Sequence, residues 1–81
     1  MAQQTPLSAI ETTQGICGGQ ARIRNTRIPV WTLVSLRQQG ATDVELLRNY
    51  PNLRQQDLEA AWSYYDENNA EIDRYIALDN D

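Results

Sequence analysis

The chain contains no histidine and only one cysteine among its 81 residues. One cysteine cannot form an intramolecular disulfide, and without histidine the chain offers neither a Cys/His pair nor a zinc quartet. It also lacks a phosphate-binding glycine loop, so the common nucleophile–base sets cannot be assembled. We therefore expect no enzymatic activity, no cofactor and no metal site. Chemistry carried out by carboxylates alone is the one enzymatic alternative left open.

Long apolar runs are also absent. No stretch approaches the roughly 18 apolar residues of a membrane-spanning helix, and the N-terminus lacks the basic region and apolar core of a signal peptide. Both absences predict a soluble, cytoplasmic protein with no membrane partner. The length suits one domain covering residues 1–81, in which residues 1–6 and 78–81 are expected to be flexible.

Lysine is missing too, and all seven basic residues are arginine. Residues 1–56 carry six arginines and three acids, a net charge of +3, whereas residues 57–81 carry one arginine and eight acids, a net charge of −7. Such asymmetry predicts two surfaces for two kinds of partner. A solvated acidic helix face followed by an acidic tail is the simpler alternative.

A short β-ribbon is predicted near the N-terminus. Ala21 and Ile23 alternate with Arg22 and Arg24, which is the period of a half-buried strand. A two-residue turn is expected at 25–26, because asparagine tolerates positive φ angles. Residues 22–24 and 27–30 are expected to form the ribbon or, alternatively, an extended entry to the first helix, and a further short strand is predicted around residues 8–12.

The first two helices are marked by signals at their ends. Apolar residues at helical spacing predict a helix over residues 30–39, and Gly40 is a typical residue just after a helix end. Thr42 and Glu45 then have the spacing of a capping box, which starts a second helix. Pro51 ends that helix after about seven residues.

The third helix has the clearest apolar stripe, formed by Leu58, Ala61, Trp62 and Tyr65. Trp62 lies in the middle of this stripe and is expected to be central to the core. Asn68 and Glu71 are spaced like a second capping box, which predicts a last helix. Its inward residues are expected to be Ile72, Tyr75 and Ile76. The aromatic residues sit at helical spacings, which favours packing over base stacking.

The second and third helices, joined by a short turn at Pro51, have the outline of a helix-turn-helix. The N-terminal end of the second helix of such a pair enters the major groove, where arginine pairs with guanine or phosphate and glutamine with adenine. The candidate DNA contacts are Arg48, Arg54, Gln55 and Gln56. Asp57 and Glu59 oppose DNA binding, and the two glutamines are alternatively ordinary polar residues of a first turn.

Three arginines near the ribbon are candidates for contact with phosphate or with a partner's carboxylates. Arg22 and Arg24 are two residues apart, so they share one face of a strand. They are alternatively plain solvated arginines, whose removal leaves stability nearly unchanged. Arg27 lies beside the helix start and is alternatively paired with an acid of its own domain.

The order and spacing of these pieces resemble a bacterial family, domain of unknown function 433, whose members are similar to VapB-type antitoxins. The matching residues are Gly18-Gly19, Arg24 to Trp31, Gly40, Tyr50 to Leu53, Leu58, Ala61 and Tyr64-Tyr65. Asn25 stands where the family usually has glycine, and Arg54 where it usually has threonine or serine. The resemblance implies a homeodomain-like helical fold with an N-terminal β element, often paired with a PIN-like nuclease toxin.

Two functions therefore remain open. The first is a non-enzymatic antitoxin-like regulator that binds its own operator DNA through a helix-turn-helix and neutralises a PIN-like toxin. The second is a protein-interaction or dimerisation module without nucleic acid. A homodimer is expected in either case, because the domain is small and a two-stranded ribbon is marginally stable alone.

Overall fold

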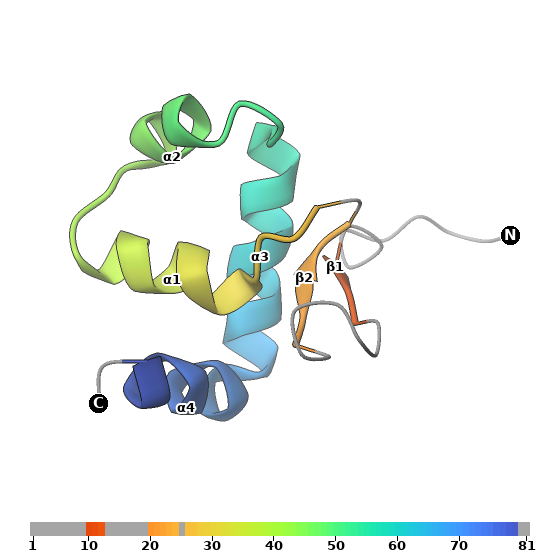
Figure 1. The fold of residues 1–81 in the computed structure, drawn as a ribbon, viewed down its shortest axis with the longest axis vertical. Coiled ribbons are helices and arrows are strands. Elements are labelled where there is room, and N and C mark those ends of the chain that lie inside the picture. Colours follow the sequence, from red (N-terminus) through yellow and green to blue (C-terminus); the bar gives the residue numbers. More distant parts are fainter. Residues whose placement is uncertain (1–9, 13–19, 25, 80–81) are drawn as a thin grey trace, which may run out of the picture.

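The computed structural model of the chain describes residues 10–12, 20–24 and 26–79. Within these residues the order of elements is β1 (Ile10–Glu11), β2 (Arg22–Ile23), α1 (Val30–Gln38), α2 (Asp43–Asn49), α3 (Gln55–Glu67) and α4 (Asn69–Asp79) (Figure 1). The described part is therefore mainly helical, with four helices and a short two-stranded antiparallel sheet, in agreement with the coarse prediction.

Of the two ends that are expected to be flexible, residues 1–6 lie entirely outside the described residues. The last two residues of the predicted C-terminal tail are likewise outside, but its first two, Leu78 and Asp79, belong to α4. None of the described helices is both long enough and apolar enough to cross a lipid bilayer.

The N-terminal β element pairs differently from the predicted ribbon. β1 and β2 are antiparallel, with Ile10 opposite Ile23 and Glu11 opposite Arg22. This confirms the described part of the strand expected around residues 8–12. The predicted arm at 27–30 meets β2 through one isolated bridge, between Arg22 and Pro29. The bridge is made by two flanking hydrogen bonds, from the Ile23 amide to the Ile28 carbonyl at 3.0 Å and from the Val30 amide to the Ala21 carbonyl at 2.9 Å. Because α1 begins at Val30, the pairing does not extend further along the chain.

Local end signals place α1 and α2 as the sequence predicts. After α1, Gly40 has a φ of +108°, and a Cβ added there would meet nothing within 4 Å, so the conformation itself favours glycine. At the start of α2, the Glu45 amide donates to Thr42 Oγ1 at 3.2 Å and the Thr42 amide donates to Glu45 Oε1 at 2.9 Å. The predicted capping box is therefore confirmed.

The stripe of α3 is present, but its centre differs from the prediction. Leu58 and Ala61 are completely buried, whereas Trp62 is half-buried. The guanidinium of Arg37, on α1, lies 4.5 Å from the centre of the Trp62 ring. Trp62 therefore lies at the edge of the core, where its ring stacks against the Arg37 guanidinium. The central position that the sequence predicted for Trp62 is occupied by Leu58.

The junction of α3 and α4 also differs from the prediction. Asn68 Nδ2 donates to the Tyr64 carbonyl at 3.0 Å, so this side chain serves the C-terminal end of α3. The Glu71 carboxylate accepts a hydrogen bond from the Tyr64 hydroxyl at 3.0 Å. Both side chains of the expected capping box thus make other contacts, of which the bond between Tyr64 and Glu71 joins α3 to α4.

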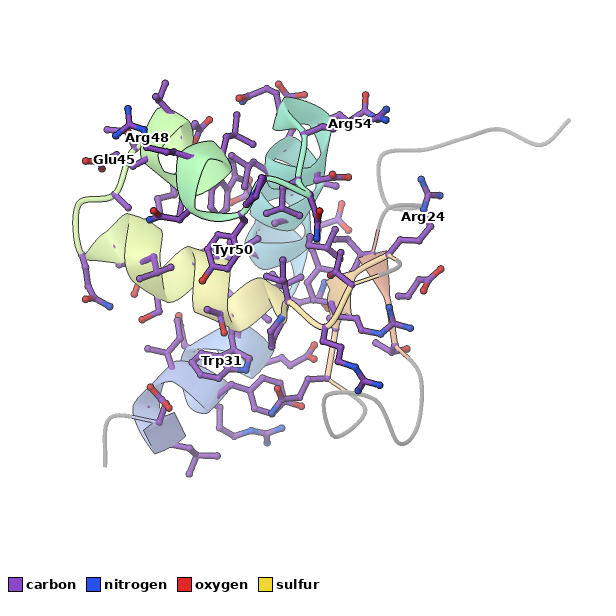
Figure 2. The ribbon with its side chains drawn as sticks, turned by 45° about the horizontal axis from the view of Figure 1, so that its top comes forward. Arg24, Trp31, Glu45, Arg48, Tyr50 and Arg54 are labelled. Atoms are coloured by element: carbon purple, nitrogen blue, oxygen red, sulfur yellow. The ribbon has the colours of Figure 1, made fainter. Side chains whose placement is uncertain are left out.

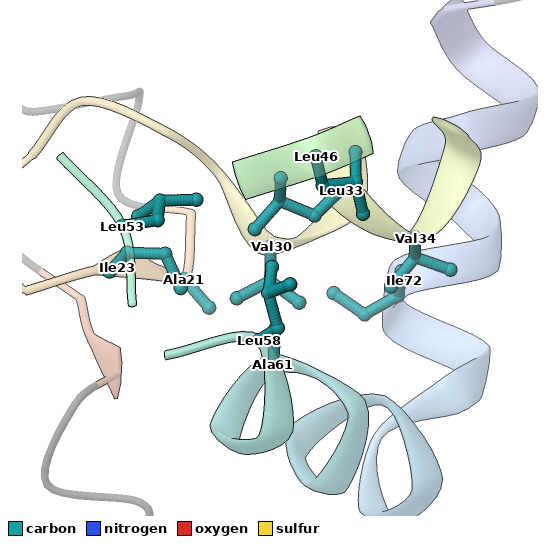
Figure 3. Packing of buried hydrophobic residues seen from close by; sticks show 10 residues of the cluster. All are labelled: Ala21, Ile23, Val30, Leu33, Val34, Leu46, Leu53, Leu58, Ala61 and Ile72. Atoms are coloured by element: carbon teal, nitrogen blue, oxygen red, sulfur yellow. The ribbon is translucent and has the colours of Figure 1, made fainter. Parts of the chain in front are cut away.

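The core forms where α3 crosses the other helices. α1 contacts α3 and α4, α2 contacts α3, and β1 also contacts α3. Figure 3 shows the buried cluster, whose members are Ala21, Ile23, Val30, Leu33, Val34, Leu46, Leu53, Leu58, Ala61 and Ile72. In Figure 1, α2 lies at one end of α3 and α4 at the other. The long α3 therefore separates two ends of the molecule, and these ends carry different charges.

Candidate nucleic-acid interface

The start of α3 is held by its own backbone and by one acid. Arg54 precedes the helix in an extended conformation, and its amide donates to Asp57 Oδ2 at 2.9 Å. The amides of Asp57 and Leu58 in turn donate to the Arg54 carbonyl. The Arg54 guanidinium carries only donors and cannot accept from the free amides of the first turn, so its side chain does not cap the helix and is exposed.

The four candidate DNA contacts are all exposed and come from two helices. Arg48 lies in the last turn of α2, while Arg54, Gln55 and Gln56 begin α3. Figure 2 shows Arg48 and Arg54 at the end of the molecule where α2 and α3 meet, with their side chains directed outward. The fold therefore gathers the predicted residues at one end, as separate solvent-exposed groups.

One contact at this end was missed by the sequence analysis. Gln55 Nε2 donates to Asp43 Oδ2 at 2.9 Å, which joins the first turn of α3 to the first turn of α2. The two residues are 12 positions apart, and a polar pair at that separation leaves no periodic signal in the sequence. One of the two predicted glutamine readers is consequently already engaged in the free protein.

The difference in charge between the two parts of the sequence corresponds to a difference between the two ends of the molecule. Arg48 and Arg54 lie at the α2 end of α3, together with the acids Asp43 and Glu45. At the opposite end, the last turn of α3 and the exposed side of α4 carry Asp66, Glu67, Asp73 and Asp79. Figure 1 places α4 at the far end of α3 from α2. The acidic segment is thus held away from the candidate interface.

Arg22 does not lie on a solvated face, and that expectation is wrong. Its side chain is only 7% exposed, and Nη2 lies 3.1 Å from Glu11 Oε1. Nη1 also donates to the Thr26 carbonyl at 3.1 Å. The cause is the sheet register, which sets Glu11 directly opposite Arg22. Arg22 is therefore a buried structural residue, whereas Arg24 and Arg27 are exposed.

The aromatic residues pack against the core, as their spacing predicts. Trp31, Trp62, Tyr64, Tyr65 and Tyr75 are all half-buried and pack against the hydrophobic cluster. The Trp31 indole donates to Gln20 Oε1 at 2.8 Å, and the Tyr65 hydroxyl donates to Asp73 Oδ1 at 2.7 Å. The buried Trp62 Nε1, in contrast, has no hydrogen-bond partner among the described residues. These rings are committed to joining elements and are not presented as a stacking platform.

The environment of the Tyr64 hydroxyl makes its contribution to stability depend on pH. Burial, followed by the hydrogen bond to Glu71, raises the pKa of Tyr64 from 10.0 to about 12. Because the folded state holds the neutral phenol more firmly, this contribution to stability is complete below pH 10 and is lost as the pH rises towards 12.

We expect absorbance titration of the folded protein to show a late-ionising tyrosine that the Tyr64→Phe variant lacks. Titration in concentrated urea is the control, since unfolding returns tyrosine to its ordinary pKa. An unchanged late component in Tyr64→Phe would contradict the assignment.

Comparison with known proteins gives a family match and a solved relative. A sequence model described as a protein of unknown function, DUF433, matches residues 10–65. The chain is also similar to the crystal structure of a DUF433 member protein from Anabaena variabilis, with 68% identity and a TM-score of 0.84. That alignment covers 85% of this chain and 68% of the other chain. No curated protein matches.

Proposed function

This chain belongs to the DUF433 family of proteins of unknown function, and we propose that it is a non-enzymatic, antitoxin-like regulator that binds DNA. The observation that carries the proposal is the exposed start of α3, which presents Arg54, Gln55 and Gln56 at the end of the molecule where α2 carries the exposed Arg48. In this proposal α2 and α3 form a homeodomain-like helix-turn-helix, and α3 is the helix that enters the major groove.

Each side chain has a distinct role in the proposed complex. Arg54 donates to guanine or to a phosphate, and Arg48 binds the DNA backbone beside it. Gln56 and Gln55 read adenine edges, and Gln55 first leaves Asp43. The N-terminal end of α3 adds the partial positive charge of a helix dipole, which favours a nearby phosphate.

We propose that the active form is a homodimer. A two-fold pair would set two α3 helices at a fixed separation, so that the operator contains two half-sites about one turn of DNA apart. A dimer also supplies additional buried area to a chain whose small size limits its own core. The expected stoichiometry is two chains for each operator duplex.

The acidic end is proposed to serve the second partner. In the antitoxin proposal, the acids of α4 occupy the nucleic-acid groove of a PIN-like nuclease, where they compete with phosphate for basic residues. This would be a VapB-type arrangement, with DNA binding and toxin neutralisation at opposite ends of α3. Sequencing the neighbouring reading frame and purifying the native complex test this part. If no PIN-like protein is encoded nearby and none co-purifies, the antitoxin role is withdrawn.

The DNA-binding part is tested by fluorescence anisotropy with the protein's own promoter fragment at low and moderate salt. We expect Arg54→Ala to weaken binding by about 1–3 kcal/mol. Arg74→Ala is the matched control, because Arg74 is an exposed arginine on α4, at the other end of α3. Equal affinities for the wild-type, Arg54→Ala and Arg74→Ala proteins would refute the proposed interface.

A protein-interaction module without nucleic acid is the second candidate. It is favoured by the acids that accompany the arginines: Asp43 holds Gln55, and Glu45 and Glu59 are exposed on α2 and α3. Like charges near phosphate reduce affinity, and phosphate contacts normally dominate binding to DNA. The same anisotropy experiment separates the two functions, because sequence-specific binding with a steep salt dependence excludes the module.

A further inference from the structure

A compact turn between β2 and α1 carries two exposed arginines. We call it the arginine turn and define it as Ile23, Arg24 and Thr26–Ile28, which are its described residues. The Thr26 amide and hydroxyl both donate to the Ile23 carbonyl, at 3.1 Å and 2.7 Å. The Ile28 amide donates to Thr26 Oγ1 at 3.1 Å, and the Ile23 amide donates to the Ile28 carbonyl at 3.0 Å. Thr26 therefore closes the turn from both sides.

An ion pair between the buried Arg22 and the partly exposed Glu11 supports this turn. Arg22 donates to the Thr26 carbonyl and at the same time pairs with Glu11 on β1, each at 3.1 Å. Ile23 is completely buried and Ile28 packs against the core, so both ends of the turn are fixed. A contact surface held in one conformation loses little conformational entropy when it binds a ligand.

The exposed arginines of the turn lie on the same side as the start of α3. Arg24 and Arg27 are both exposed. In Figure 1 the turn at the head of β2 lies beside the half of α3 that is nearer α2, and β1 contacts α3. Figure 2 shows Arg24 and Arg54 projecting on the same side of the molecule. Arg24 and Arg54 thus face one side of the molecule, from which the arginine turn and the start of α3 are both accessible.

We propose that the arginine turn is a second DNA contact, in which Arg24 and Arg27 bind backbone phosphates that flank the bases read by α3. This inference rests on the proposed DNA-binding function and adds a site outside the helix-turn-helix. Guanidinium groups pair with phosphate through two parallel hydrogen bonds. The acids of α4 lie at the opposite end of α3 from Arg54, so they do not repel a phosphate bound between Arg24 and Arg54.

A backbone contact has a signature that base reading lacks. Each phosphate neutralised by an arginine releases condensed counterions, so it adds about 0.9 to the slope of log affinity against log salt. A phosphate contact is also independent of the DNA sequence, so its loss weakens specific and non-specific binding equally. The two arginines of the turn are thereby distinguishable from residues that read bases.

The experiment measures binding of the full chain to its promoter fragment and to an unrelated duplex of equal length, over a range of salt. We expect Arg24→Ala and Arg27→Ala each to weaken binding to both duplexes by roughly five- to fifty-fold and to lower the salt slope by about one. Arg24→Lys, which keeps the charge, should retain most of the slope. Arg74→Ala is the control on α4, and melting curves verify that each variant is folded.

Two different failures can be told apart. If Arg54→Ala weakens promoter binding while Arg24→Ala and Arg27→Ala leave affinity and slope unchanged, the arginine turn is overturned and the proposed function stands. If the wild type shows no preference for its promoter, the proposed function fails. The salt slopes of the wild type, Arg24→Ala and Arg27→Ala on the unrelated duplex then still show whether the arginine turn contacts phosphate. Absence of binding to any duplex at low salt overturns both.

Discussion

Leu58→Ala is expected to lower the free energy of unfolding by about 2–5 kcal/mol. Leu58 is 0% exposed and lies on α3, the helix that every other helix contacts. Removing its methyl groups loses apolar burial and leaves a cavity that the surrounding elements can only partly fill. Because domains are stable by about 5–15 kcal/mol in total and small ones lie at the low end, this loss should remove a large part of the free energy of unfolding.

The measurement is urea or thermal unfolding followed by circular dichroism. Leu78→Ala is a matched control, because it makes the same chemical change at a residue that is 63% exposed near the end of α4. Its effect is expected to stay within about 0.5 kcal/mol. If the two variants unfold at the same urea concentration, Leu58 does not hold the core as described.

The second large effect is expected at Arg22. Arg22→Ala removes the partner of Glu11 and the donor to the Thr26 carbonyl, so stability should fall by about 1–3 kcal/mol. The larger losses of stability that follow when a fully buried ion pair is broken are not expected here, because the Glu11 side chain is 38% exposed and water screens its charge. The loss should appear as a lower melting temperature and a lower urea midpoint.

Arg24→Ala is the control for this prediction, since it removes an exposed arginine two residues away. Its effect on stability is expected to be within about 0.5 kcal/mol. A double-mutant cycle with Glu11→Gln isolates the pair itself. If Arg22→Ala is as mild as Arg24→Ala, then Arg22 is a solvated surface residue, as the alternation of the sequence first suggested.

Helix ends could be predicted from the sequence because their signals are local. The Thr42–Glu45 capping box needs two side chains three residues apart, and the geometry of the first helical turn brings them together in any fold. Gly40 and Pro51 act through their own backbone preferences, which are independent of tertiary structure. These features set the number and order of the helices within the described residues.

Features that depend on long-range pairing could not be predicted in this way. The burial of Arg22 follows from the position of Glu11 in β1, 11 residues earlier, and nothing in the local alternation reveals that register. The periodicity of α3 likewise gave the correct face, but it could not tell which residue on that face sits deepest. Leu58 lies under neighbouring elements, whereas Trp62 lies at the edge beneath Arg37.

For the candidate interface, the sequence predicted that its side chains are exposed but not the contacts that they make. Exposure of Arg48, Arg54 and Gln56 follows from their places on helix surfaces, so the sequence pattern was sufficient. The hydrogen bond between Gln55 and Asp43 depends on how α2 and α3 cross, which helix spacing does not determine. Asn68 shows the same limit, because its spacing to Glu71 fits a cap that the structure does not use.

The α4 end of the molecule is acidic, the α2 end carries arginines mixed with acids, and the whole chain has a net charge of −4. Beyond the Debye length, about 8 Å in physiological salt, a polyanion interacts weakly with either end, and the net charge provides no attraction. Attraction begins only when the arginine end is already near the phosphates and the α4 end points away. Encounter with DNA is therefore expected to be short-ranged and orientation-dependent, without the accelerated association of strongly basic proteins.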